Sequence, residues 1–252
     1  MDNVAKTRMR LRFARLEGAV DMSHLEQIRA LRDIAAGSGL DCCPAKHGHS
    51  LVPKMSFGPA LSAGYGSRCE YADLYLAQAC KEEVAMAKLS AVRSEAFSLL
   101  SVKRVPVYFP SIEASVSAAR YLIEAEFEKV FTQADVDAFL ARESAPYTKP
   151  APTGPGGTGE AGPGLTIDIR PLVMNAELDA AAGTLRLTLK VEPGRNVKPV
   201  EVLGVMAGPL PGDLPTGGNR LSGFPYGREL EIKKVVREEL YWLDSKGRPE
   251  VI

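Results

Sequence analysis

Arg8-Met9-Arg10-Leu11-Arg12-Phe13 is the stretch that decides the fold, because arginine and apolar residues alternate at every position. Side chains on a β-strand alternate between its two faces, so this segment buries one face and exposes a row of arginines on the other. Residues 123–128, Ile-Glu-Ala-Glu-Phe-Glu, repeat the pattern with the opposite charge. The sequence therefore predicts two sheets, each buried on one side and polar on the other.

Length and composition fit an ordinary globular protein. At 252 residues, the chain is long enough for one large domain or two small ones. Basic and acidic residues number 31 each, so the basic excess of a dedicated nucleic-acid binder is missing. No apolar run reaches the roughly 18 residues that a membrane helix needs, and the N-terminus has no apolar signal core. We therefore expect a cytoplasmic protein without a membrane partner.

Residues 1–113 follow the order strand, helix, strand, strand, helix, strand. The opening strand covers residues 8–15, and Ser23 with Glu26 forms a capping box at the start of the first helix. Its apolar residues recur at helical spacing. The remaining segments are an extended stretch at 54–61, a strand at 69–76, a helix at 81–96 and a strand at 97–105.

Residues 114–252 repeat this order, which predicts an α+β fold of two tandem ferredoxin-like units with antiparallel sheets and helices on one face. Residues 144–164 hold five prolines and six glycines, and we expect this segment to be a loop inserted into the second unit. The expected elements are strands at 120–130, 165–174, 184–191 and 220–230, and helices at 132–142 and 199–206.

Six short segments, in this order and spacing, resemble one known family. They are Arg10-Leu11-Arg12-Phe13, residues 23–31, residues 53–57, Glu70-Tyr71-Ala72-Asp73, residues 167–171 and residues 198–203. Together they are similar to the radical-SAM-linked family of uncharacterised domains. Members are fused to, or encoded beside, radical S-adenosylmethionine (SAM) proteins, often ones with a cobalamin-binding domain.

The resemblance implies a non-catalytic accessory or substrate-presenting partner of a radical SAM enzyme. The iron–sulfur chemistry would belong to that enzyme, because this chain has no Cys-x3-Cys-x2-Cys spacing, and we expect no cofactor in it. Residues 45–53 depart from the Gly-Phe-Asn-Pro-His-Pro type of loop that the family has there. The family motifs imply ligand- or partner-binding roles for Arg10, Arg12, His24, Arg29, Lys54, Ser56, Glu70 and Arg170.

The arginine strand leaves two interpretations open. Arg8, Arg10 and Arg12 could contact the phosphates of an RNA held between the two units, although aromatic residues for base stacking are sparse. They could instead form ion pairs with the glutamates of residues 124–128. RNA binding or RNA modification is therefore the second functional hypothesis, after the accessory role.

Other candidate chemistry is weak. His47 and His49 lie two residues apart near Cys42 and Cys43, but no Cys-x2-Cys pair completes a metal set, so we expect no metal. The four isolated or adjacent cysteines do not form a disulfide framework. His24 lies in the first turn of its helix, where a neutral imidazole could act as an acid or base or simply pack on the sheet. No Ser/His/Asp set or phosphate-binding loop accompanies it.

Overall fold

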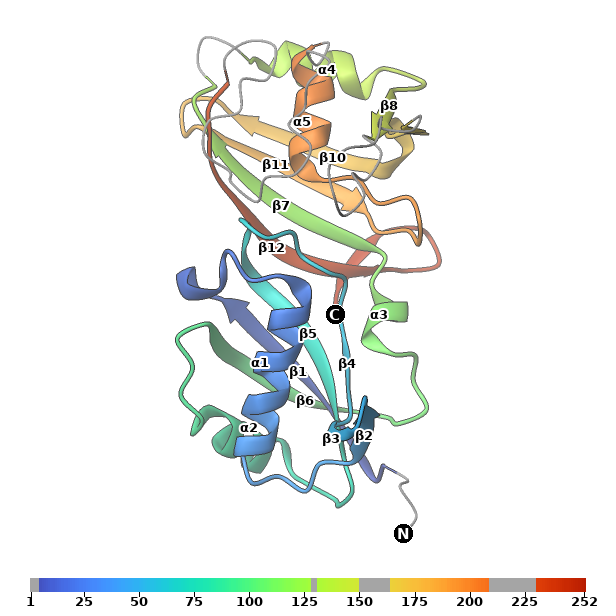
Figure 1. Ribbon diagram of the computed structural model, residues 1–252. Helices are drawn as coiled ribbons and strands as arrows, with labels where there is room; N and C mark the ends of the chain where they lie inside the picture. The colour runs from blue at the N-terminus through green and yellow to red at the C-terminus, as the bar shows by residue number, and fades with distance from the viewer. Residues whose placement is uncertain (1–4, 128–130, 150–163, 209–229) are drawn as a thin grey trace. The chain divides into compact units, whose positions relative to one another are not determined.

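Figure 1 shows the computed structural model, which describes residues 5–127, 131–149, 164–208 and 230–252. The chain forms two compact units. Unit 1 comprises residues 1–117 together with 237–252, and unit 2 comprises residues 118–236. The expected ranges, 1–113 and 114–252, differ from these units chiefly at the end of the chain, where the last segment belongs to unit 1.

Unit 1 has the strand order of a ferredoxin-like unit. Its sheet runs β6-β1-β5, and β4 and β12 both pair with β5. The β1–β5, β1–β6 and β4–β5 pairs are antiparallel. A β2–β3 hairpin is inserted after the first helix. The elements are β1 (Thr7–Arg15), η1 (Glu17–Ala19), α1 (His24–Gly37), β2 (Pro44–His47), β3 (Ser50–Pro53), β4 (Met55–Phe57), β5 (Gly66–Leu76), α2 (Glu82–Ser90), β6 (Phe97–Val105), α3 (Ile112–Ser115), the later part of β12 (Ile232–Leu243) and β13 (Pro249–Val251).

The apolar residues of β1 build the core of unit 1. Met9, Leu11 and Phe13 are almost fully buried on the face that α1 and α2 cover (Figure 1). Phe13 meets Phe97 edge to face, with ring centroids 5.6 Å apart. The strand expected from the arginine–apolar alternation is therefore confirmed, and its arginines lie on the opposite face of the sheet.

Unit 2 repeats the same order. Its sheet runs β10-β11-β7, with the first part of β12 beside β7. An antiparallel β8–β9 pair follows α4, in the position that β2–β3 takes in unit 1. The α+β class with antiparallel sheets is thus confirmed. The elements are β7 (Ala118–Ala125), α4 (Gln133–Leu140), β8 (Pro146–Lys149), β9 (Leu165–Asp168), η2 (Arg170–Leu172), β10 (Val173–Asp179), β11 (Thr184–Lys190) and α5 (Pro199–Ala207).

The prediction of one continuous strand over residues 165–174 is wrong, because β9 ends at Asp168. Asp168 Oδ1 accepts hydrogen bonds from the backbone N–H groups of Ala145 and Arg170, at 2.9 and 3.1 Å. The chain then makes a 3-10 turn that includes Pro171, which has no N–H for a strand ladder. The sheet strand begins only at Val173.

Two expectations fall largely outside the described residues. Residues 150–163 of the proline- and glycine-rich segment lie outside the described residues, and residues 146–149, which were expected in the loop, instead form β8 and pair with β9. The expected strand at 220–230 also lies outside the described ranges, apart from Leu230. The strands that the structure does describe near the end of the chain are β12 and β13. No helix in the described part of the chain is long and apolar enough to cross a membrane.

Candidate functional site

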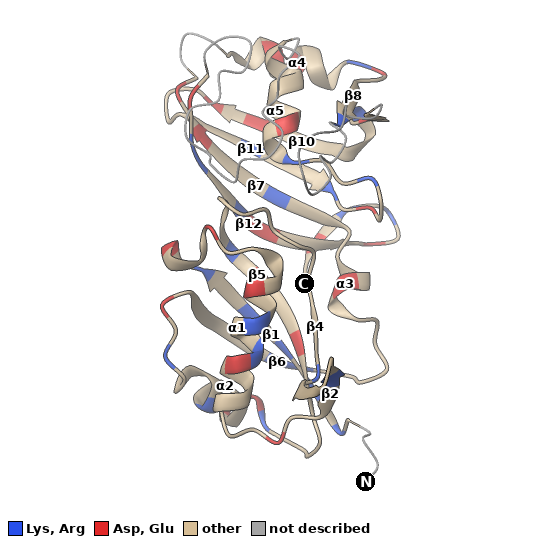
Figure 2. Cartoon of the chain, viewed as in Figure 1, with Lys and Arg blue, Asp and Glu red and all other residues tan. Residues whose placement is uncertain are grey.

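The candidate site lies on the face of the unit 1 sheet that α1 and α2 leave uncovered. Arg10 on β1 is directly opposite Asp73 on β5. Directly opposed residues of an antiparallel pair point to the same face, so the arginines of β1 and the aspartate of β5 meet there. Figure 2 shows the basic positions of β1 next to the acidic positions of β5.

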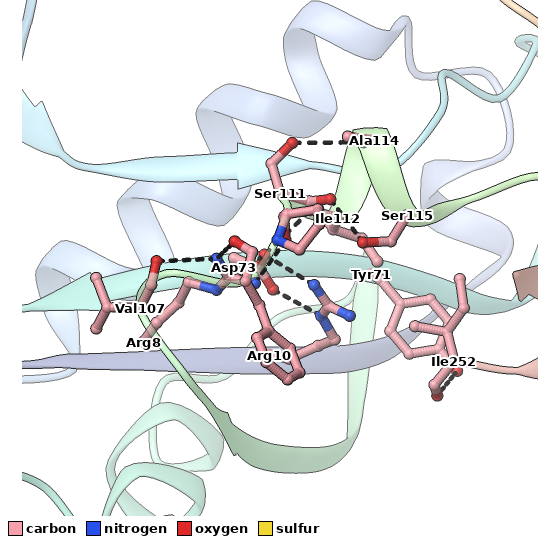
Figure 3. Close-up of polar contacts among 12 residues, drawn as sticks. Arg8, Arg10, Tyr71, Asp73, Val107, Ser111, Ile112, Ala114, Ser115 and Ile252 are labelled. Carbon is pink, nitrogen blue, oxygen red and sulfur yellow. Dashed lines mark hydrogen bonds and ion pairs between the residues drawn. The ribbon is translucent and has the colours of Figure 1, made fainter.

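Asp73 is the centre of this site, and its side chain is completely buried. Its carboxylate accepts two hydrogen bonds from Arg10, Nε at 2.8 Å and Nη2 at 3.1 Å (Figure 3). Arg8 Nε lies 3.4 Å from Oδ2, and the backbone N–H of Ile112 donates to the same oxygen at 3.1 Å. A buried carboxylate is tolerated when it is paired and hydrogen-bonded in this way.

Arg8 connects Asp73 to the loop formed by residues 106–111, which joins β6 to α3. The Arg8 side chain is only 1% exposed. Its guanidinium donates to the backbone oxygens of Phe109 and Pro110 at 2.7 Å each, and to that of Val107 at 3.5 Å. One buried cation thus holds three carbonyl groups of the 106–111 loop, and the planar donor fork of arginine suits such a role.

The 106–111 loop carries the most prominent apolar surface in the described ranges. Val107, Tyr108 and Phe109 are 41%, 85% and 51% exposed. They form the only run of consecutive exposed large hydrophobic residues that the structure describes. The Tyr108 and Phe109 rings meet edge to face with centroids 5.3 Å apart. Isolated exposed apolar residues are common, but a run of three on a loop whose carbonyls are held by a buried arginine is not.

Both ends of the 106–111 loop are anchored. Val105, just before it, pairs with Arg8 in the β1–β6 ladder. Ser111 ends the loop and caps α3, where its Oγ accepts from the N–H of Ala114 at 3.4 Å and its carbonyl accepts from Ser115 Oγ at 2.8 Å. Ile112, which donates to Asp73, is fully buried. The loop is therefore fixed by its ends and by its carbonyls.

Aromatic rings lie among the cations of this face. Lys54 Nζ lies 5.0 Å from the Tyr75 ring centroid, and Arg8 Cζ lies 6.0 Å from it. Arg12 Cζ lies 5.9 Å from the centroid of Tyr71. Such contacts contribute about 0.5–2 kcal/mol, depending on solvent exposure. Tyr71 is itself buried, which raises the pKa of its phenol.

Arg12 pairs with Glu239 of β12, with Nη2 and Oε2 2.7 Å apart. This finding corrects the expectation that the β1 arginines pair with the glutamates of residues 124–128, since Asp73 and Glu239 are their partners. Glu126 instead pairs with Lys233 at 2.8 Å, and Glu128 lies outside the described residues.

A second buried ion pair lies on the helix-covered side of unit 1. Glu70, which the family motifs imply as a binding residue, accepts a hydrogen bond from Arg237 of β12, with Nε and Oε1 2.9 Å apart. Both side chains are almost fully buried. Arg15 nearby donates to the backbone oxygens of Ala19 and Val20, at 2.6 and 3.0 Å, and burial lowers its pKa. This network stabilises the entry to α1.

His24 is the first residue of α1, and the charges of this network affect its pKa. Burial lowers the pKa of His24; Glu70 opposes that effect and Arg237 adds to it. Its Nδ1 is shielded from solvent and has no hydrogen-bond partner among the described residues. The Ser23–Glu26 capping box that positions this turn is confirmed. His24 therefore lies on the side of the sheet opposite Asp73.

The structure brings only part of the predicted site set together. Arg10, Arg12 and Lys54 share the Asp73 face, and Ser56 of β4 is directly opposite Asp73 in the ladder. Arg29 is an exposed residue of α1. Arg170, in unit 2, donates to the carbonyl oxygens of Leu140 and Val173 and so stabilises the end of α4.

The histidine pair lies elsewhere. His47 and His49 are exposed at the tip of the β2–β3 hairpin, whose turn contains Gly48 at φ 59°. In the described part of the chain, no group of three or more His, Cys, Asp or Glu residues is placed to hold a metal. All four cysteines are free thiols, and burial raises the pKa of Cys42 to about 11.

Sequence reasoning missed the residues that organise the site. Asp73 and Arg237 have no local sequence pattern that marks them as partners of a distant charge. The loop does carry a recognisable signal, because an apolar Val-Tyr-Phe run stands between Pro106 and Pro110, directly after a strand. The link between this run and Arg8, about a hundred positions earlier, has no local signature.

Comparison with known proteins places the chain in a family. A family model described as "Uncharacterized protein conserved in bacteria (DUF2344)" matches residues 8–199. The chain belongs to this family. No curated protein matches the chain. The family match covers β1, the Asp73 face and the 106–111 loop, but not β12, which supplies Glu239 and Arg237.

Proposed function

We propose that this protein is a non-catalytic accessory protein that docks onto a radical SAM enzyme through the 106–111 loop. The observation that carries the proposal is the clamp: a buried arginine, paired with a buried aspartate, holds three carbonyls of a loop with exposed aromatic side chains. The motif resemblance described above supports the identity of the partner.

Preorganisation is the reason why this arrangement suits docking. Association costs entropy when loops and side chains become ordered, and a loop held in advance avoids much of that cost. Tyrosine is among the residues that contribute most at protein interfaces, and aromatic residues are enriched there. Arg8 and Asp73 expose no surface to a ligand, so their role in this proposal is to position the loop.

The test is affinity purification from the native host under anoxic conditions. The bait is the full chain or its Tyr108→Ala/Phe109→Ala variant, and the readouts are mass spectrometry for proteins and sequencing for RNA. Both substitutions are on exposed side chains, so the variant should fold normally, which circular dichroism checks. A stoichiometric radical SAM enzyme that is recovered with the full chain and lost with the variant supports the proposal. Equal recovery with both baits contradicts docking through the loop.

RNA binding is the second proposal, and one observation favours it: exposed Lys103 and Arg104 lie near the end of β6, just before the loop that carries exposed Tyr108 and Phe109. Cations and aromatic rings together are the usual means of binding single-stranded RNA. However, Arg8 is buried and Arg10 is held by Asp73, so two of the three arginines in the original hypothesis are occupied. A defined RNA that is released by salt, without an enzyme, would favour this alternative.

A further inference from the structure

The chemistry of the partner surface follows from the cations next to the 106–111 loop. Lys103 is directly opposite Arg10 on β1, and Arg8, which holds the loop, lies two residues before Arg10 on that strand. Two residues of a strand span about 7 Å. Lys103 therefore lies beside the loop, on the same face, and its side chain is 72% exposed.

The carboxylates that contact this face do not balance its basic groups. Five basic side chains belong to it: Arg8, Arg10, Arg12, Lys54 and Lys103. Among the described residues, three side-chain carboxylates contact them, namely Asp73, Glu239 and Glu82, and Glu82 reaches Lys103 only at 4.0 Å. An exposed pair at that distance contributes little to holding Lys103 in place. Lys103 is thus the basic group of the face that is most available to a partner.

We propose that the loop docks into an apolar pocket of the enzyme bordered by carboxylates, and that Lys103 pairs with one of them. This inference rests on the proposed function and adds the chemistry of the enzyme's surface. Charge complementarity argues for acidic rather than basic residues around that pocket, because like charges across an interface suppress binding. The apolar contact supplies affinity, and the charge pair supplies orientation and speed of association.

The test uses the enzyme recovered in the anoxic purification and a zero-length carbodiimide cross-linker, which couples lysine amines to carboxylates. The bait carries Glu82→Gln, which removes the carboxylate of its own chain that competes for Lys103. Cross-links from Lys103 to Asp or Glu of the enzyme are expected. Lys103→Arg keeps the charge but cannot be coupled, so it should lose the cross-link and retain binding. Lys88, on α2, whose amine donates to the carbonyl of Gly39, is the control lysine and should give no such cross-link.

Binding kinetics provide the second readout. Lys103→Glu should slow association about threefold to tenfold at low salt, and the difference should shrink as salt rises. Tyr108→Ala/Phe109→Ala should weaken binding about 30-fold or more, the effect of losing an aromatic hot spot. If the loop variant fails to bind but Lys103 couples to no carboxylate and Lys103→Glu behaves as wild type, the acidic border is refuted and docking stands. If no radical SAM enzyme is recovered, the proposed function itself fails.

Discussion

At the residue scale, Asp73 has the largest structural consequences in the site. It is the only carboxylate that the structure places against both Arg8 and Arg10 in the described ranges, and all three side chains lie mostly or wholly out of solvent. An intact buried ion pair is weak evidence for stability. Substituting one of its two residues, however, leaves the other charge buried without a partner. Arg8 and Arg10 would both be left in that state.

Asp73→Asn should therefore destabilise unit 1 by about 3–5 kcal/mol, since it keeps the shape of the side chain and removes its charge. Urea unfolding followed by fluorescence of Trp242, the one tryptophan of the chain and a residue of unit 1, measures the change. The matched control is Glu82→Gln, which removes an exposed pair with Lys103 within unit 1 and should leave stability nearly unchanged. Equal effects of the two substitutions would refute the role given to Asp73.

His24 should make the stability of unit 1 depend on pH. Its pKa is lowered in the folded protein, chiefly by burial, so the unfolded chain binds a proton more readily. Stability should be fully present above the ordinary pKa of about 6.5 and decrease as pH falls from there toward the folded value. Melting temperatures between pH 7.5 and 5.5 should show a decrease that is smaller in His24→Gln. Parallel curves for the two proteins would exclude this contribution.

At the element scale, the 106–111 loop depends on the donor geometry of Arg8. A lysine in its place keeps the charge but offers one ammonium group, which cannot reach three carbonyls as a guanidinium does.

Arg8→Lys should loosen the loop and leave β1 paired, because the backbone ladder is unchanged. Hydrogen–deuterium exchange should rise at the amides of residues 107–112 and stay near wild type in β5. Unchanged exchange in the loop would show that its ends, rather than Arg8, fix it.

The sequence predicts those elements whose signals are local. The alternation in residues 8–13 predicts β1, and the Ser23–Glu26 pair predicts the start of α1, because neighbours in sequence make these contacts. The repeated element order predicts the α+β class. The turn between β10 and β11 also has a local signal, because it contains Gly183 at φ 65°, a conformation that glycine adopts readily.

The candidate site was only partly predictable, because its contacts join distant positions. Arg8 reaches Phe109 over 101 positions, and Arg237 reaches Glu70 over 167. Alternation shows that Arg8 and Arg10 share a face, but it does not distinguish a carboxylate on the adjacent strand from one on residues 124–128. The burial of Arg8 has no local signal for the same reason, since arginine is rarely buried unless it is paired and its partners are distant in sequence.

At the scale of the whole molecule, unit 1 is completed by the end of the chain. Residues 237–252 return to unit 1 after unit 2, and they supply Arg237 to Glu70 and Glu239 to Arg12. The fold of unit 1 therefore depends on a segment that follows the whole of unit 2 in sequence.

Arg237→Met should destabilise unit 1 by about 3–5 kcal/mol, because Glu70 would stay buried without its cation. Adding Glu70→Gln should recover part of the loss, since the double variant has no unpaired buried charge. The Trp242 unfolding curve measures both variants. Additive losses in the double variant would mean that Glu70 and Arg237 act independently.

The central claim is that a buried clamp presents an aromatic loop for docking, and one binding measurement tests it most directly. The affinity for the partner enzyme that the proposal expects to co-purify is measured under anoxic conditions for the wild-type chain and for Tyr108→Ala/Phe109→Ala. The account predicts a loss of about 30-fold or more with an unchanged melting temperature. An affinity equal to that of the wild type, in a variant that folds normally, would contradict it.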